Sequence, residues 1–169
     1  MAVKYDPQTH QRRSVRLAGF DYSQAGAHFI TICTQDRKLS LQAEPVRDAI
    51  RSAWSGLPAR FPGVALDEFV IMPNHVHGII ILEGEAASSA SMVLGAASSA
   101  PTLGRIVRAF TSISGVEANR ALGRSNRPFW QRSYHEHIIR NEGELHAVRR
   151  YILGNPGNWP DDPENPSNL

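Results

Sequence analysis

Two histidines, His75 and His77, stand one residue apart in the stretch PNHVHG, between the apolar runs FVIM and IIIL. Side chains at positions i and i+2 of a β-strand leave the same face of a sheet, so the two imidazoles should project side by side. Two neutral imidazoles at this spacing can share one divalent cation, with a third ligand supplied from elsewhere in the chain. The alternative is a polar strand entrance whose histidines are solvated or bonded to the backbone.

A second pair with the same spacing, His135 and His137, occurs in the stretch HEH, where Glu136 faces away from its neighbours. Taken alone, this pair is an equally good metal-binding candidate. It also fits an exposed polar edge strand. We favour the edge strand, because the residues before His75 are the more core-like of the two contexts.

A tyrosine and an asparagine, Tyr151 and Asn155, lie four residues apart in a helical pattern, so they should share one helix face. A phenol has a pKa near ~10 and is a poor nucleophile unless the charge that develops is stabilised. A cation held by His75 and His77 could polarise a phosphate, with Asn155 as its third ligand. This combination predicts phosphoryl transfer by Tyr151. The alternative is that Tyr151 only packs at the margin of the core.

Strand and helix patterns along the chain predict the elements on which these candidate residues lie. Alternating, β-rich stretches predict strands, and apolar residues with helical spacing predict helices. The expected strands span residues 27–34, 66–72, 75–82 and part of 127–140, and the expected helices span residues 45–57, 103–122 and 142–155. Adjacent strands joined by tight turns, with helices of modest length, predict an α+β fold. We expect a ferredoxin-like, mainly antiparallel sheet covered by helices.

The composition is that of one globular domain, with 41% hydrophobic and 20% charged residues in 169. We expect this domain to span residues 1–156, with a flexible loop at 83–101, where AASSA occurs twice, and an irregular Pro-rich tail at 157–169. No apolar run approaches the ~20 residues that span a bilayer. The single Cys33 excludes an internal disulfide framework, and the N-terminal stretch lacks the apolar segment of a signal peptide. We therefore expect a cytoplasmic protein.

Three ordered motifs resemble one family of enzymes. The stretches FVIMPNHVHG, WQRSYHEHIIRNE and RRYILGNP resemble the single-tyrosine HUH transposases, and within them the REP-associated tyrosine transposases. The stretch RLAGFDYSQAGAHFITICTQDR also resembles the N-terminal segment of that group. The resemblance covers residues 12–156, and three motifs in order are far more specific than any one alone.

The resemblance implies a domain that cuts and rejoins single-stranded DNA at hairpin-forming repeats. It implies His75, His77 and Asn155 as metal ligands, and Tyr151 as the nucleophile that forms a 5′-phosphotyrosine. Members of the family use Mg²⁺ or Mn²⁺. They commonly form homodimers, although REP-associated members can act as monomers. Tyr134 is a second nucleophile candidate, but many relatives carry another aromatic residue there, which favours a packing role.

Arginine accounts for 16 of the 18 basic residues, and its guanidinium group suits phosphate oxygens. The candidate DNA-binding residues are Arg12, Arg13, Arg16, Arg105, Arg108, Arg132 and Arg140. The resemblance ranks the first three highest, because relatives use their N-terminal segment to recognise sequence beside the hairpin. The alternative for each residue is an ordinary solvated arginine. Unpaired bases could stack on Phe129 or Trp130, unless those rings belong to the core.

Two other functions stay open beside DNA strand transfer. A relative that grips repeat hairpins without cutting them would bind DNA and form no covalent adduct. A metal hydrolase would use His75 and His77 with water as its nucleophile, and would retain cleavage when Tyr151 is replaced by Phe.

Overall fold

The computed structural model describes residues 25–83 and 101–168. Three candidate DNA-binding residues, Arg12, Arg13 and Arg16, therefore lie outside the described residues, as does the expected loop 83–101 apart from its two ends. Within the described ranges, no helix combines the length and the apolar character needed to cross a bilayer.

The described chain contains four strands and four α-helices, close to the positions that the sequence predicts. They are β1 (Gly26–Cys33), α1 (Glu44–Ser55), α2 (Leu57–Arg60), β2 (Val64–Ile71), β3 (His75–Leu82), α3 (Leu103–Ala121), β4 (His135–Ile139) and α4 (Glu142–Gly154). Local signals fix the starts of the helices. Asn141 caps α4 by accepting a hydrogen bond from the backbone N–H of Glu144 at 2.9 Å, and Pro45 occupies the first turn of α1.

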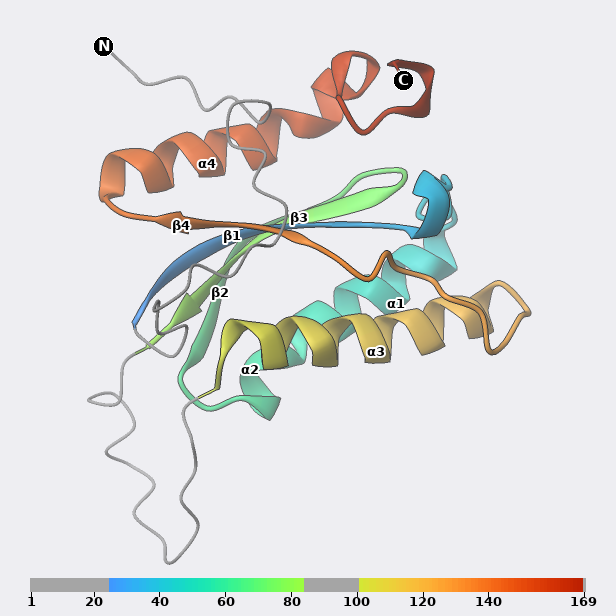
Figure 1. The fold of residues 1–169 in the computed structure, drawn as a ribbon, viewed down its shortest axis with the longest axis horizontal. Coiled ribbons are helices and arrows are strands. Elements are labelled where there is room, and N and C mark those ends of the chain that lie inside the picture. The colour runs from blue at the N-terminus through green and yellow to red at the C-terminus, as the bar shows by residue number, and fades with distance from the viewer. Residues whose placement is uncertain (1–24, 84–100, 169) are drawn as a thin grey trace, which may run out of the picture.

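The four strands form one sheet in the order β2-β3-β1-β4, and every neighbouring pair is antiparallel (Figure 1). The two central strands, β1 and β3, are joined to the edge strands through α1 and α3. This alternation of strands and helices, with this strand order, is the ferredoxin-like arrangement. The predicted α+β fold is confirmed.

Helices cover both faces of the sheet, with α1 and α3 on one side and α4 on the other (Figure 1). Because successive side chains of a strand alternate, Ile32 and Val76 join the core formed with α1 and α3. Ile79 packs instead in the smaller cluster beneath α4. His75 and His77 are in phase with Ile79, so both imidazoles face the α4 side of the sheet.

A glycine directly after the histidine pair lets α1 pack closely on the sheet. A Cβ added at Gly78 would lie 2.5 Å and 2.7 Å from two ring atoms of Trp54. That indole stacks on Phe69 of β2, with ring centroids 4.3 Å apart. The glycine of PNHVHG therefore serves the packing of Trp54 against the face opposite the imidazoles.

The C-terminal segment is more ordered than the irregular tail that we expected at 157–169. It forms two 3₁₀ helices, η3 (Asn155–Asp161) and η4 (Pro166–Asn168), and it buries Asp162 and Asn165. Proline prevents a regular α-helix here, but short 3₁₀ turns tolerate it. Asn74 donates to the carbonyl oxygen of Glu164 at 2.7 Å, which ties this segment to the start of β3.

Candidate active site

The histidine pair lies at the buried start of β3. His75 is fully buried and His77 is 3% exposed. Their Nε2 atoms converge to 3.0 Å from each other. Two neighbouring ligands of an octahedral ion, each about 2.1 Å from the metal, lie roughly 3.0 Å apart. The spacing of the two nitrogens therefore suits one small divalent cation.

Asn74 fixes the tautomer of His75. The Asn74 amide nitrogen donates to the carbonyl oxygens of Arg37 and Glu164, which turns its Oδ1 toward the imidazole. That oxygen can only accept a hydrogen bond, so Nδ1 of His75, 2.8 Å away, must donate. The proton of His75 therefore resides on Nδ1, and Nε2 presents a bare lone pair toward His77.

Thr31 performs the same orienting role for the other imidazole. Its hydroxyl lies 2.8 Å from Nδ1 of His77. Thr31 pairs directly with His77 across β1 and β3, so the sheet register itself delivers the contact. Such outer hydrogen bonds hold metal-ligating imidazoles in their tautomer and orientation. Thr31 and Asn74 were not among the candidates from the sequence, although Thr31 falls on the correct face of the predicted strand.

Burial keeps both imidazoles neutral. It lowers the pKa of His75 to about 3, with a smaller contribution from the nearby Arg37. It lowers the pKa of His77 well below the ordinary value as well, and a proton on His75 would lower it further by repulsion. A neutral imidazole is the form that coordinates a metal. The pair is therefore ready to bind a cation over the whole physiological pH range.

Tyr151 reaches this site from α4. Its ring lies edge-on to His77, with centroids 5.3 Å apart, and to Phe29 at 6.0 Å. Burial raises the pKa of the phenol to about 12, and the Asp162 carboxylate adds to the rise. A side-chain hydrogen bond with Asn155 acts in the opposite direction. The hydroxyl is thus protonated at neutral pH and needs a positive charge nearby to become a nucleophile.

Asn155 lies at the end of α4, with its side chain turned inward. It is 3% exposed, and its Oδ1 atom has no hydrogen-bond partner among the described residues. A buried carbonyl oxygen without a partner is costly, and an oxygen of this kind is a suitable ligand for Mg²⁺ or Mn²⁺. This orphaned oxygen fits the presence of a cation at the site.

Asp162 brings a carboxylate to the same place, which the sequence pattern did not predict. One of its oxygens lies 3.7 Å from Nε2 of His75. The ligand atoms of His75, His77 and Asp162 all lie within 4.8 Å of one another. Burial raises the pKa of the Asp162 carboxyl and the charge of Glu164 adds to the rise, whereas the backbone N–H of Glu164 and the nearby Arg37 act in the opposite direction. Two imidazoles and a carboxylate form a reasonable donor set for a divalent metal.

Comparison with known proteins identifies the family to which the chain belongs. Residues 21–155 match the family model described as transposase, IS200-like. The chain belongs to the IS200-like transposase family. The transposase predicted from the three sequence motifs is thereby confirmed at the level of the family.

The fold of this IS200-like transposase resembles two solved structures. One is the REP-associated tyrosine transposase bound to a REP hairpin, with a TM-score of 0.59 and 21% identity, over 82% of this chain and 71% of that one. The other is a candidate transposase of Deinococcus radiodurans R1, with a TM-score of 0.50 and 17% identity, over 80% of this chain and 93% of that one. In sequence, an uncharacterized protein of Haemophilus influenzae is 34% identical over 177 aligned residues, which cover 96% of this chain and 97% of that protein.

The second histidine pair of the transposase does not join the first. His137 is bound to Glu144 of α4, with 2.6 Å between Nε2 and Oε1, while His135 is exposed. Glu144 also accepts the backbone N–H of Arg140, so its carboxylate closes the turn between β4 and α4. In the part of the chain that the structure describes, the only cluster of His, Cys, Asp or Glu suited to a metal is the one that contains His75 and His77.

The other candidate residues of the transposase separate into surface and core. Arg105 and Arg108 on α3, Arg132 before β4, and Arg140 after β4 are all exposed. Phe129 and Trp130 are buried in the core, so neither ring offers a free face on which a base could stack. Tyr134 packs against the core beneath α1 and α3, on the side of the sheet away from Tyr151.

Proposed function

We propose that this transposase is a metal-dependent enzyme that cleaves and rejoins single-stranded DNA at hairpin-forming, REP-type repeats through a 5′-phosphotyrosine at Tyr151. The observation that carries the proposal is the approach of Tyr151 to His77, which puts a buried phenol beside two converging imidazole nitrogens. The hairpin substrate is inferred from the REP-associated transposase of similar fold, whose structure contains a REP hairpin.

The metal ligands in this proposal are His75 and His77, with oxygens from Asn155 and Asp162. Mg²⁺ or Mn²⁺ bound there would withdraw charge from a phosphate oxygen and stabilise the negative charge of the transition state. The chain itself holds the two imidazoles neutral, fixes the tautomer of His75 through Asn74, orients the ring of His77 through Thr31, and excludes bulk water by burial.

Tyr151 performs the covalent step. The phenol gives up its proton, its oxygen forms a bond to phosphorus, and the bond between phosphorus and the 3′ oxygen breaks. The departing 3′ oxygen takes a proton and becomes a free hydroxyl. Because the phosphotyrosine keeps the energy of the broken phosphodiester bond, a 3′-hydroxyl can later reverse the step without ATP. A phenol with a pKa near 12 reacts slowly unless nearby positive charge stabilises its anion, which accounts for its position beside the metal ligands.

One chain suffices to form this site in the proposal. Tyr151, on α4, contacts His77 of the same chain, and α4 is tied to β2 by an ion pair between Arg149 and Asp67. The exchange of α4 between two chains is not required. A homodimer remains a prediction, but catalysis would not depend on it.

Incubation with a REP-type stem-loop DNA and Mn²⁺ tests the proposal. We expect a protein–DNA adduct that survives SDS, and we expect EDTA to prevent its formation. DNA binding without any adduct, across a set of repeat substrates, would contradict the proposal and leave a hairpin-binding protein that does not cut. Cleavage without an adduct would indicate a metal hydrolase that uses water.

A further inference from the structure

Arg37 brings a positive charge to the edge of the candidate metal site. It ends the short 3₁₀ turn η1 (Gln35–Arg37), which follows β1 and is bonded to the turn before β3. The backbone N–H of Thr34 donates to the carbonyl oxygen of Asn74 at 2.8 Å, and the Asn74 amide donates to the carbonyl oxygen of Arg37 at 3.3 Å. Because Asn74 also orients His75, the backbone of Arg37 is fixed relative to the first imidazole.

The guanidinium of Arg37 lies among the groups that surround this imidazole. Its Nη1 atom is 2.8 Å from Oε2 of Glu164, and the same oxygen accepts a hydrogen bond from the Cys33 thiol at 3.5 Å. Cys33 stands directly opposite His75 in the pairing of β1 and β3, and the backbone N–H of Glu164 binds Asp162. The charge of Arg37 lowers the pKa of both His75 and Asp162. It therefore acts on two of the candidate metal ligands.

The hydrogen-bonding capacity of this guanidinium is not used by the protein. Its Nη1 atom is buried and has no hydrogen-bond partner within residues 25–83 and 101–168, since its contact with Glu164 lacks the alignment of a hydrogen bond. Arg120 shows the aligned arrangement, because its Nη1 donates to both carboxylate oxygens of Glu117 at 2.9 Å. A guanidinium with unfilled donors suits a phosphate. The Arg37 side chain is 34% exposed, so such a ligand can reach it.

The backbone that carries this side chain is strained. The φ angles of Asp36 and Arg37 are 57° and 52°, in the left-handed region that residues with a Cβ adopt at a cost. Glycine would adopt this conformation freely, but it would supply no charge. Strain of this kind persists where surrounding contacts impose it, and it is concentrated at functional sites. The backbone N–H of Arg37 is held by the carbonyl oxygen of Thr34 at 3.0 Å.

Two buried atoms without partners lie at this site and have complementary requirements. Among the described residues they are Oδ1 of Asn155 and Nη1 of Arg37. The amide oxygen suits a cation, whereas the guanidinium can only donate and so cannot be a metal ligand. A phosphate bound to a metal would satisfy both atoms, because the metal meets the amide oxygen and a phosphate oxygen meets the guanidinium.

We propose that Arg37 is a further catalytic residue, whose guanidinium donates to a non-bridging oxygen of the DNA phosphate that Tyr151 attacks. The contact stabilises the negative charge that this oxygen gains in the transition state. This inference rests on the proposed function and adds to it a positive charge that belongs to the chain itself. Arg37 was not among the arginines that the sequence indicated, because its surroundings depend on long-range contacts with Asn74 and Glu164.

The rate of adduct formation in a single turnover tests this role. Arg37→Ala, in excess over a saturated stem-loop DNA, is mixed with Mn²⁺, and the rate constant is compared with that of the unmodified chain. We expect a fall of about 100-fold. Added guanidinium ions, below the concentration that unfolds the protein, should restore part of the rate, because they can occupy the space of the deleted group. A rate that equals that of the unmodified chain would overturn the inference.

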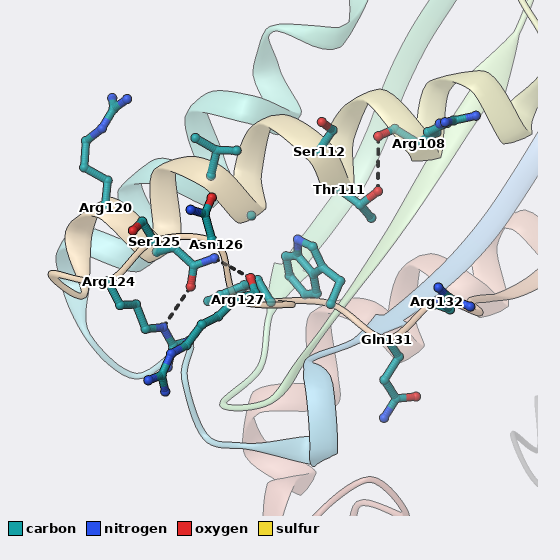
Figure 2. Close-up of a pocket in the computed structure, with 15 residues that line it drawn as sticks. Arg108, Thr111, Ser112, Arg120, Arg124, Ser125, Asn126, Arg127, Gln131 and Arg132 are labelled. Atoms are coloured by element: carbon teal, nitrogen blue, oxygen red, sulfur yellow. Dashed lines mark hydrogen bonds between the residues drawn. The ribbon is translucent and has the colours of Figure 1, made fainter.

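The matched control is Arg120→Gln. Figure 2 shows Arg120 near the end of α3, extending away from the other residues drawn. Its charge is exposed and already paired with Glu117. The variant should keep the rate constant of the unmodified chain, and guanidinium ions should not raise it. A fall equal to that of Arg37→Ala would show an effect of net charge, and would overturn the assignment to Arg37.

Glu164→Gln separates catalysis from a structural role. If Arg37 served only to anchor the C-terminal segment, Glu164→Gln would lower the rate as much as Arg37→Ala does. We expect no loss in Glu164→Gln. We also expect the Kd of Arg37→Ala for Mn²⁺, measured without DNA, not to rise, because Arg37 meets the phosphate and not the metal. Equal losses of rate in the two variants, or weaker Mn²⁺ binding that accounts for the lost rate, would overturn the proposal.

Arg37→Lys keeps the inference testable if Arg37→Ala does not fold, which thermal unfolding would show. Lysine keeps the charge opposite Glu164 but lacks the planar fork. Its rate constant should lie well below that of the unmodified chain, and an equal rate constant would overturn the proposal. Failure of the proposed function would show separately, because the unmodified chain would then form no adduct.

Discussion

The carboxylate of Asp162 lies 3.7 Å from Nε2 of His75, although the two residues are far apart in the sequence. The contact arises because η3 turns the chain back over the sheet after α4. Asp162 also accepts the backbone N–H of Glu164 at 2.7 Å, and Glu164 forms an ion pair with Arg37 at 2.8 Å. The C-terminal segment is therefore a structural part of the candidate metal site.

Replacement of Asp162 by Asn tests its role toward the metal. Asn keeps the shape and can still accept the N–H of Glu164, but it removes the negative charge. We expect the Kd for Mn²⁺, measured by calorimetry or by EPR titration, to rise at least about tenfold. The matched control is Asp161→Asn, at the exposed neighbouring position, which should leave the Kd unchanged. Equal affinities for the two variants would show that Asp162 is not a ligand.

The sequence predicted the parts of the site that depend on periodicity. The spacing of His75 and His77 indicated one strand face, and the spacing of Tyr151 and Asn155 indicated one helix face, because both follow from local backbone geometry. Asp162 could not be predicted in this way. It lies in a Pro-rich segment without periodicity, and its position depends on long-range hydrogen bonds such as that between Asn74 and Glu164.

The same difference between local periodicity and long-range contacts explains which parts of the fold could be predicted from the sequence. The strand β1 followed from its alternating, β-rich stretch, and the strands β2 and β3 followed from the apolar runs FVIM and IIIL on either side of the histidine pair. The role of Phe129 and Trp130 stayed open, because an aromatic residue in a loop can face either solvent or core. In the structure the rings face the core, because α3 packs directly on this segment: a Cβ added at Gly115 would lie 3.5 Å from Phe129, in van der Waals contact.

Gly78→Ala should destabilise the fold. The added methyl group would overlap the ring of Trp54, which is itself held between Phe69 and Phe110. We expect the free energy of unfolding, measured in urea, to fall by about 1–3 kcal/mol. Gly157→Ala is the control, because nothing lies within 4 Å of a Cβ at that position. A loss no larger than that of the control would mean that Trp54 moves aside freely.

His28 should make stability depend on pH. Burial lowers its pKa from 6.5 to about 4, so between these values the unfolded chain binds a proton that the folded chain excludes. The free energy of unfolding should therefore be independent of this group above pH 6.5, and should fall by up to about 3 kcal/mol as the pH drops to 4. His75 and His77 contribute in the same direction.

The variant His28→Leu isolates the contribution of His28. Its free energy of unfolding in urea is measured at several pH values and compared with that of the unmodified chain. The variant keeps the other two buried histidines, so it should show a shallower loss of stability between pH 6.5 and 4 than the unmodified chain. Parallel curves for the two proteins would show that His28 takes up its proton in the folded state without cost.

Mixing two inactive variants should not restore activity. The contact between Tyr151 and His77 lies within one chain, so a mixture of His77→Ala and Tyr151→Phe contains no complete site. We expect no SDS-stable adduct from this mixture at any protein concentration. An adduct that appears only on mixing would show that two chains exchange α4 and share their sites.

The position of the covalent bond to DNA decides whether Tyr151 is the nucleophile. The unmodified chain, Tyr151→Phe and Tyr134→Phe are each incubated with a stem-loop DNA and Mn²⁺, and any adduct is digested and its peptides are sequenced by mass spectrometry. We predict adducts in the unmodified chain and in Tyr134→Phe, with the nucleotide on Tyr151, and none in Tyr151→Phe. An adduct that persists in Tyr151→Phe, or that maps to Tyr134, would contradict the proposed mechanism.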